Sequence, residues 1–176
     1  VIGAGAAQTM MNLHHIKPGN RILMLGSGNV GLVVSYQLLQ AGCEVVALAD
    51  AAPRVGGYGV HAAKVARCGV PFYLSHTIVR VEGDDYVTGV VIGQVGPDWK
   101  IIPGTEKHFD VDTVCLAVGL SPMSQLLKQA EVQMSDTKGG NVPVIDKFGA
   151  TSVPGIYAAG DVSGIEEASS AMIEGR

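Results

Sequence analysis

Unbroken apolar runs alternate with helix-like segments along the first part of the chain. Residues 21–25 (RILML) and 44–50 (EVVALAD) are short continuous apolar runs, the pattern of parallel strands buried on both faces. Between them, residues 30–42 have helical spacing and end at a glycine, a common helix stop. Residues 58–69 predict a further helix, and residues 70–76 a third strand. The pattern therefore predicts a β-α-β unit that continues into a parallel sheet.

The pattern changes in the second half of the chain. Residues 78–109 alternate polar and apolar positions and are interrupted by GDD and GPD, which is typical of an antiparallel meander. A buried strand returns at 111–119, a short helix is expected at 121–132, and GIYAAGD (155–161) is expected to form the last buried strand. The fold class predicted is α/β, with a parallel sheet and an antiparallel β-meander.

Composition narrows the class of protein. Apolar residues make up 47% and charged residues 16%, which excludes a disordered chain, and no apolar run approaches the ~20 residues of a membrane span. The net charge of −4 argues against nucleic acid or an anionic membrane as a partner. Cys43, Cys68 and Cys115 form no CxxC and are expected in the core, and His14 and His15 lack further ligands at zinc spacing. We therefore expect no metal site and a reducing, cytoplasmic location.

Glycine is abundant, at 24 of 176 residues, and three glycines form a GxGxxG loop between the first strand and its helix. Gly26 suits the tight turn, Gly28 lets a pyrophosphate approach the backbone, and Gly31 permits close packing of helix on strand. The helix N-terminus offers unpaired N–H groups to phosphate, which adds Asn29 and Val30 to the predicted site. A glycine turn without any ligand is the alternative interpretation.

An acidic residue ends the second strand. Asp50 follows Gly31 by 19 residues, where a carboxylate accepts hydrogen bonds from the adenosine ribose of a dinucleotide. The same carboxylate would repel a 2′-phosphate, so NAD is favoured over NADP. Arg54 lies four residues further on and offers a partner for that phosphate, which keeps NADP open.

The opening residues partly match the same GxGxxG motif. VIGAGAAQ has Gly3 and Gly5, but Gln8 stands where the third glycine belongs. No second strand with a terminal acid follows at the required distance, because that place holds the start of the first motif. We interpret this segment as a connector, and a damaged nucleotide loop is the alternative. A helix with apolar spacing at Met10, Leu13 and Ile16 is expected within it.

Two later segments carry recognisable motifs, TVCLAVGLSP (113–122) and TSVPGIYAAGD (151–161). They resemble the two late motifs of the pyridine nucleotide–disulfide oxidoreductase superfamily. The resemblance implies a Rossmann-like, three-layer FAD/NAD(P)-binding fold and an aspartate that binds the ribityl chain of FAD. The positions that carry it are Thr113, Ala117, Gly119, Pro122, Gly160 and Asp161.

The resemblance also implies a function and a division of the chain. Residues 1–18 would connect from a missing FAD domain, residues 19–117 would bind NAD(P), and residues 118–176 would return to the FAD-binding domain. Ala117, Val118 and Gly119 would line the junction with the flavin. Hydride would pass between nicotinamide and flavin in the full-length parent enzyme, an FAD/NAD(P)-dependent oxidoreductase. The present chain is expected to be a piece of it that is inactive alone, and no catalytic acid or base is assigned.

Two further segments resemble one branch of the superfamily. They are the opening residues 1–20 and the sequence EEASSAM, which follows the second motif. That branch contains subunits of amine-oxidising complexes related to sarcosine oxidase, opine oxidase and hydrogen cyanide synthase. It implies an alternative role, a non-catalytic nucleotide-binding subunit that docks a partner oxidase subunit. A one-domain NAD dehydrogenase is a third interpretation, disfavoured because no His/Asp or Lys/Tyr constellation is evident. Glu166 and Glu167 are expected to open the last helix.

Overall fold

The computed structural model describes residues 1–137, 140–165 and 168–176. The chain divides into two compact units, Val1–Val118 and Gly119–Arg176, and each is described by itself. The division falls within two residues of the boundary predicted after residue 117. The assignment of the parts to an FAD-binding and an NAD(P)-binding domain stays a prediction.

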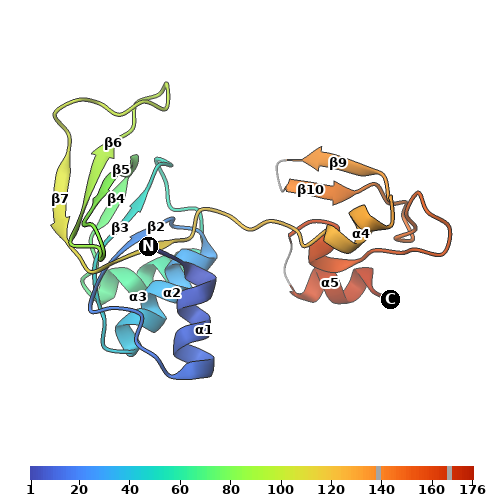
Figure 1. Cartoon of the computed structure of the whole chain (residues 1–176), viewed down its shortest axis with the longest axis horizontal. Coiled ribbons are helices and arrows are strands. Elements are labelled where there is room, and N and C mark those ends of the chain that lie inside the picture. The colour runs from blue at the N-terminus through green and yellow to red at the C-terminus, as the bar shows by residue number, and fades with distance from the viewer. Residues whose placement is uncertain (138–139, 166–167) are drawn as a thin grey trace. The chain divides into compact units, whose positions relative to one another are not determined.

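The first unit is built on a five-stranded sheet in the order β1-β8-β2-β3-β4 (Figure 1). All four neighbouring pairs are parallel. Strands β2 and β3 begin and end where the apolar runs predict them. The five strands are β1 (Ile2–Gly3), β2 (Arg21–Leu25), β3 (Glu44–Asp50), β4 (Phe72–Leu74) and β8 (Thr113–Leu116).

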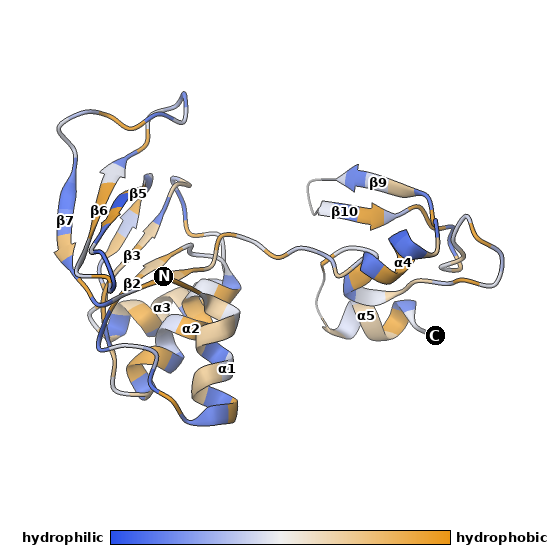
Figure 2. Ribbon diagram, in the orientation of Figure 1, coloured by the Kyte–Doolittle hydropathy of each residue, from blue (hydrophilic) through white to orange (hydrophobic). Residues whose placement is uncertain are grey.

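Helices cover one face of this sheet and the predicted meander covers the other (Figure 1). The helices are α1 (Ala4–His14), α2 (Asn29–Gln40) and α3 (Gly59–Arg67). The meander pairs β5 (His76–Glu82), β6 (Gly89–Gln94) and β7 (Lys107–Asp110) antiparallel. Buried strand residues face both layers, and Figure 2 shows β6 of the meander as largely hydrophobic, beside the more hydrophilic β7. The predicted three-layer α/β fold is confirmed.

The opening segment is part of the first unit. Ile2 and Gly3 pair with β8, and Gln8 donates a side-chain hydrogen bond to Gln37 of α2 at 3.1 Å. The expected helix forms, but the expected face is wrong. Ala4 and Ala7 are buried, whereas Leu13 is 71% exposed. Small side chains allow α1 to pack closely on its neighbour, and apolar spacing alone did not identify them.

A carboxylate fixes the first residues of the central strand. Asp112 accepts backbone hydrogen bonds from Asn20 at 2.9 and 3.0 Å and from Arg21 at 3.2 Å. Burial acts to raise the pKa of Asp112, but hydrogen bonds, chiefly from Asn20 and Thr113, outweigh it and hold the pKa below the ordinary value of 3.8. A lowered folded-state pKa means that the ionised carboxylate stabilises the fold.

Replacing Asp112 by alanine is expected to lower the free energy of unfolding by about 1 kcal/mol at neutral pH. The stabilisation is present above the ordinary pKa of 3.8 and is lost as the pH falls through the lower, folded-state pKa. Urea unfolding at several pH values measures the difference between variant and wild type. Asp110→Ala is the matched control, because among the described residues that carboxylate has only a 3.8 Å ion pair, from Oδ1 to Nδ1 of His108. A loss that is equal for both variants, or constant down to strong acid, contradicts the role of Asp112.

The second unit is smaller and has little regular structure. It contains α4 (Gln125–Gln129), a hairpin of β9 (Met134–Thr137) with β10 (Gly140–Pro143), the 3-10 turn η1 (Gly160–Val162) and α5 (Ala168–Glu174). The predicted helix at 121–132 forms over a shorter stretch. Glu166 and Glu167, expected to open the last helix, lie outside the described residues.

The predicted last buried strand, GIYAAGD, is wrong. Tyr157 makes a single bridge to Ala150, and residues 160–162 turn into η1. Tyr157 is exposed, whereas Ala158 and Gly160 are buried. A strand needs a continuous partner for its backbone groups, and the described residues supply only that bridge. The segment therefore runs from a turn at Gly155 through the bridge at Tyr157 into η1.

Cysteine burial follows the prediction at two of three positions. Cys43 and Cys115 are buried, and burial raises the pKa of both thiols, that of Cys115 to about 11. Cys68 is exposed, which corrects the expectation of a core residue. It follows α3 directly, at the end of a helix that buries only Val65.

Candidate functional site

The glycine loop joins β2 to α2 with two close backbone contacts. Gly26 has φ +110°, and a Cβ there would lie 2.2 Å from the carbonyl oxygen of Ala117. A Cβ on Gly31 would lie 2.0 Å from the carbonyl oxygen of Gly26. Both distances are far below contact, so helix, loop and strand come this close only with glycine at these positions. Gly26 and Gly31 are therefore required by the protein's own packing.

Gly28 differs from the other two glycines. A Cβ there would meet no atom within 4 Å, and its φ of −68° suits any residue. It caps α2, whose first turn carries no acidic side chain. The N–H groups of Asn29, Val30 and Gly31 have no carbonyl four residues back within the helix. Open backbone beside a helix N-terminus without a competing carboxylate fits the pyrophosphate of a dinucleotide.

Asp50 lies against the glycine loop, where its carboxylate already has partners. Oδ2 accepts hydrogen bonds from the backbone N–H and the hydroxyl of Ser27, both at 2.6 Å. Oδ1 accepts from the N–H of Ala52 at 2.8 Å. A carboxylate has about four acceptor positions, so capacity for one ribose hydroxyl remains. Spacing in the sequence did not reveal the bond to buried Ser27.

The segment after β3 folds back over the glycine loop, which the sequence did not predict. Gly57 donates its N–H to the carbonyl of Ser27 at 2.9 Å, and Gly56 donates to the Ser27 hydroxyl at 3.2 Å. The side-chain oxygen of Asn29 accepts the N–H of Tyr58 at 2.8 Å. The Asn29 side chain is thus engaged by the protein's own backbone. The sequence VGGYG (55–59) was the feature that could have revealed this fold-back. Glycine is needed at Gly57, because a Cβ there would lie 2.8 Å from the backbone nitrogen of Asn29.

A groove of about 300 Å³ runs along the carboxyl ends of the central strands. Four predicted site residues contribute to it, from β2 and its loop, from β3, and from the segment after β8. Trp99 and Thr77 of the meander complete one side, which the sequence did not predict. The lining residues are Leu25, Gly26, Asp50, Ala51, Ala52, Thr77, Trp99, Ala117 and Val118. The groove therefore brings Gly26, Asp50, Ala117 and Val118 together. The other predicted residues of the loop, Gly28, Asn29, Val30 and Gly31, do not line it.

The remaining predicted residues belong to the second unit. Gly119 and Gly160 have φ of +135° and +77°. The N–H of Gly160 donates to the Glu174 carboxylate at 2.7 Å, which ties the Gly160–Asp161 turn to α5. Asp161 lies exposed in η1. Their role toward FAD stays a prediction.

Among the residues that the structure describes, no three His, Cys, Asp or Glu side chains gather as metal ligands would. His14 and His15 are exposed. No described helix is long and apolar enough to cross a membrane.

Comparison with known proteins agrees with this architecture. Residues 2–175 match the family described as pyridine nucleotide-disulphide oxidoreductase. The chain is 29% identical to a dihydrolipoyl dehydrogenase of Manduca sexta, over 81% of this chain and 29% of that protein. It is also 29% identical to an opine oxidase subunit of Rhizobium meliloti, over 100% of this chain and 36% of that protein.

A solved structure shows the same fold. The thioredoxin reductase of T. acidophilum has a TM-score of 0.75 and 24% identity, over 99% of this chain and 54% of that chain. The chain thus spans about a third of the length of the curated relatives and half of that structure. Because the family match extends over nearly every residue, the resemblance predicted from residues 113–122 and 151–161 is confirmed. The chain belongs to the pyridine nucleotide-disulphide oxidoreductase family.

Proposed function

We propose that this chain supplies the NAD(H)-binding part of an FAD-dependent oxidoreductase. The observation that carries the proposal is the groove in which Gly26, Asp50 and Ala117 meet beside the open N-terminus of α2. The backbone N–H groups of Gly28, Asn29, Val30 and Gly31 would hold the pyrophosphate, and Asp50 would accept a hydroxyl of the adenosine ribose. When bound, nicotinamide and flavin together supply hydride transfer.

NAD is favoured over NADP by the surroundings of the ribose position. Asp50 places a negative charge there, and its two oxygens are fixed by Ser27 and Ala52. A 2′-phosphate would meet that charge, which is unfavourable in a partly buried site. Arg54 is exposed, and it is the residue that would neutralise such a phosphate.

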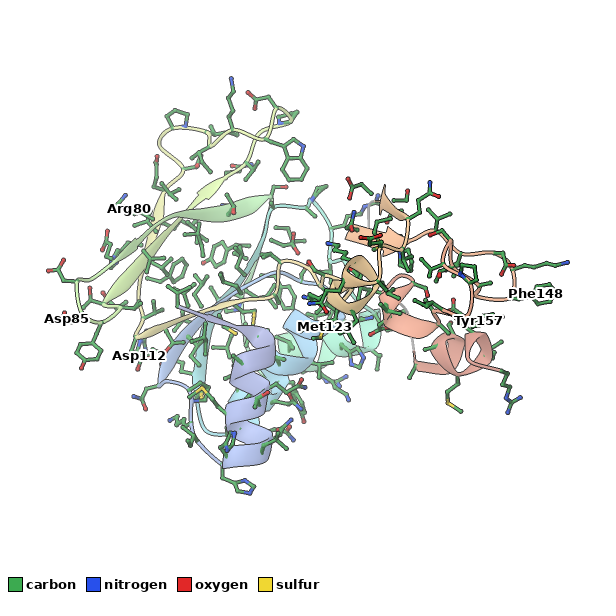
Figure 3. All side chains as sticks on the ribbon, turned by 45° about the vertical axis from the view of Figure 1, so that its right-hand side comes forward. Arg80, Asp85, Asp112, Met123, Phe148 and Tyr157 are labelled. Carbon is green, nitrogen blue, oxygen red and sulfur yellow. The ribbon has the colours of Figure 1, made fainter. Side chains whose placement is uncertain are left out.

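The second unit is proposed to complete the FAD site of the full-length protein. Gly160 and Asp161 would face the ribityl chain of FAD, and Gly119 would lie at the junction with the flavin. Met123, Phe148 and Tyr157 are large, apolar and mostly exposed on this unit, as Figure 3 shows. We propose that the rest of the FAD-binding domain contacts these side chains, because the chain spans only 54% of the solved relative.

A second candidate function rests on the similarity to the opine oxidase subunit over the whole chain. In that case the full-length protein would bind nucleotides while docking a partner oxidase, and the partner would carry the oxidation. Reduction of an artificial electron acceptor by NADH separates the two candidates. A full-length reductase with FAD would reduce the acceptor without a partner, and a full-length docking protein would not.

Calorimetric titration of the 176-residue chain with NADH and NADPH tests the proposal. We expect saturable one-to-one binding of NADH below millimolar concentration and weaker binding of NADPH. The absence of heat with either nucleotide at millimolar concentration contradicts the proposal.

Replacing Asp50 by alanine is expected to weaken NADH binding about tenfold, the effect of losing one charge-assisted hydrogen bond. NADPH binding is expected to weaken less, because the repulsion of its phosphate is also removed. Both affinities are measured by the same calorimetry.

Ser27→Ala is the matched control for Asp50→Ala. It removes the hydroxyl partner of Asp50, while the backbone N–H groups of Ser27 and Ala52 still hold the carboxylate. It should therefore preserve the preference for NADH. An equal loss of NADH and NADPH binding in Asp50→Ala refutes the ribose role of Asp50.

A further inference from the structure

Trp99 occupies an unusual position at the tip of the loop between β6 and β7. Val95 and Ile101 form a bridge, and the tip is closed by hydrogen bonds from Gly96 N–H to the Lys100 carbonyl and from Trp99 N–H to the Gly96 carbonyl. At the end of this turn Trp99 has φ +62°, a left-handed conformation that favours glycine. Its side chain is 74% exposed. Backbone strain and an exposed indole in one residue are features that collect at binding sites.

The loop that carries Trp99 is tied to Asp50 by successive hydrogen bonds. Val95 donates its N–H to the Ser75 carbonyl at 2.7 Å, and Ser75 donates to the Ala52 carbonyl at 2.9 Å. Ala52 in turn donates to the Asp50 carboxylate at 2.8 Å. This chain of bonds fixes where the loop stands relative to the proposed ribose position. The indole is therefore exposed on a positioned loop.

Trp99 lines two neighbouring pockets of the first unit, one of which is the groove described above. On one side it lines the groove with Gly26, Asp50 and Thr77. On the other side it lines a second pocket of about 510 Å³, and Ala51 lines both the groove and this pocket. Gly26 and Ala51 are small, so they leave room opposite the indole. A flat ring fits a space bounded by one large aromatic face and small residues.

The order of groups in a dinucleotide identifies that ring. With the pyrophosphate at Gly28 and the adenosine ribose at Asp50, the next group beyond the ribose is adenine. Ala51 and Ala52, which line the groove with Trp99, directly follow Asp50. The nicotinamide half leaves the pyrophosphate in the other direction. The adenine ring is therefore the group that reaches Trp99.

We propose that Trp99 binds the adenine ring of NAD(H) by stacking, with the Thr77 hydroxyl beside the ring edge. The inference rests on the proposed function, since it takes its direction from the pyrophosphate and ribose positions. Stacking of a base on an aromatic side chain is favourable for any base and needs no particular hydrogen-bond pattern. The left-handed backbone at Trp99 then serves to present the indole to the groove.

Trp99 is the single tryptophan of the chain, so its fluorescence reports on this position alone. ADP-ribose, which contains the adenine half of the cofactor, is expected to quench that fluorescence on saturation. Nicotinamide mononucleotide at the same concentration is expected to leave it unchanged. Quenching by nicotinamide mononucleotide instead of ADP-ribose overturns the assignment to adenine.

Two variants separate this inference from the proposed function. Trp99→Gly relieves the left-handed backbone and should unfold no more easily than wild type, but it should bind NADH and ADP-ribose about tenfold more weakly in calorimetry. Trp99→Phe keeps an aromatic face and should stay within about threefold of wild type. Wild-type affinity in Trp99→Gly, while wild type binds NADH, overturns the stacking role alone. Failure of wild type to bind any of these nucleotides overturns the proposed function as well.

Discussion

Replacing Gly28 by alanine is expected to reduce NADH affinity at least tenfold while leaving the fold intact. The new methyl group would meet no protein atom within 4 Å, and the backbone at Gly28 is in an ordinary extended conformation. The stability should therefore change by no more than about 0.5 kcal/mol, the scale of a glycine-to-alanine change at a helix cap. The methyl group would, however, occupy the space through which a pyrophosphate approaches the backbone.

Calorimetry measures the NADH affinity of the variant, and thermal unfolding without nucleotide measures its stability. Gly59→Ala is a matched control, because a Cβ there also meets nothing within 4 Å and Gly59 likewise lies at the start of a helix. That variant should keep both stability and affinity. Unchanged NADH affinity in a folded Gly28→Ala variant contradicts the placement of the pyrophosphate at this glycine.

Replacing Gly31 by alanine is expected to act on the fold itself. The added Cβ would lie 2.0 Å from the Gly26 carbonyl oxygen and 3.2 Å from the Ala117 Cβ, and both belong to the packed junction of β2, α2 and β8. Relieving this overlap requires α2 to move away from the sheet and disturbs the buried core on that face. We expect a loss of about 3 kcal/mol in the free energy of unfolding, the upper range for overpacking in a well-packed site.

Urea unfolding of Gly31→Ala beside Gly28→Ala gives the sharpest comparison, because both carry the same substitution three residues apart. Gly26→Ala should be at least as damaging as Gly31→Ala, since it combines a 2.2 Å overlap with a φ of +110°. Similar stability of the Gly28 and Gly31 variants contradicts the division of the loop into packing glycines and a ligand-facing glycine.

The parts of the fold that were predicted correctly are those set by local pattern. Strands β2 and β3 are buried between two layers, so nearly every residue in them is apolar and their ends are visible in the sequence. The loop between β2 and α2 was predictable because its glycines have a fixed spacing. The meander was visible through alternation and turn residues.

The parts that were missed depend on contacts between distant residues. The hydrogen bond from Ser27 to Asp50 joins residues 23 apart in the sequence. The spacing of Asp50 from the glycines is the same whether its carboxylate binds its own loop or a ribose hydroxyl. Trp99 had no assigned role because only the folded meander brings its loop to the strand ends. The segment at 155–161 was predicted as a strand from its small apolar residues, but strand formation also needs a neighbour.

The central claim is that the N-terminus of α2 and its glycine loop bind NAD(H), and amide NMR tests it most directly. On titration of the labelled 176-residue chain with NADH, we predict that the amide signals of Gly28, Asn29, Val30 and Gly31 shift to saturation. Signals from β9 and β10 in the second unit should stay in place. Binding of NADH that leaves the signals of residues 26–31 unmoved contradicts the account.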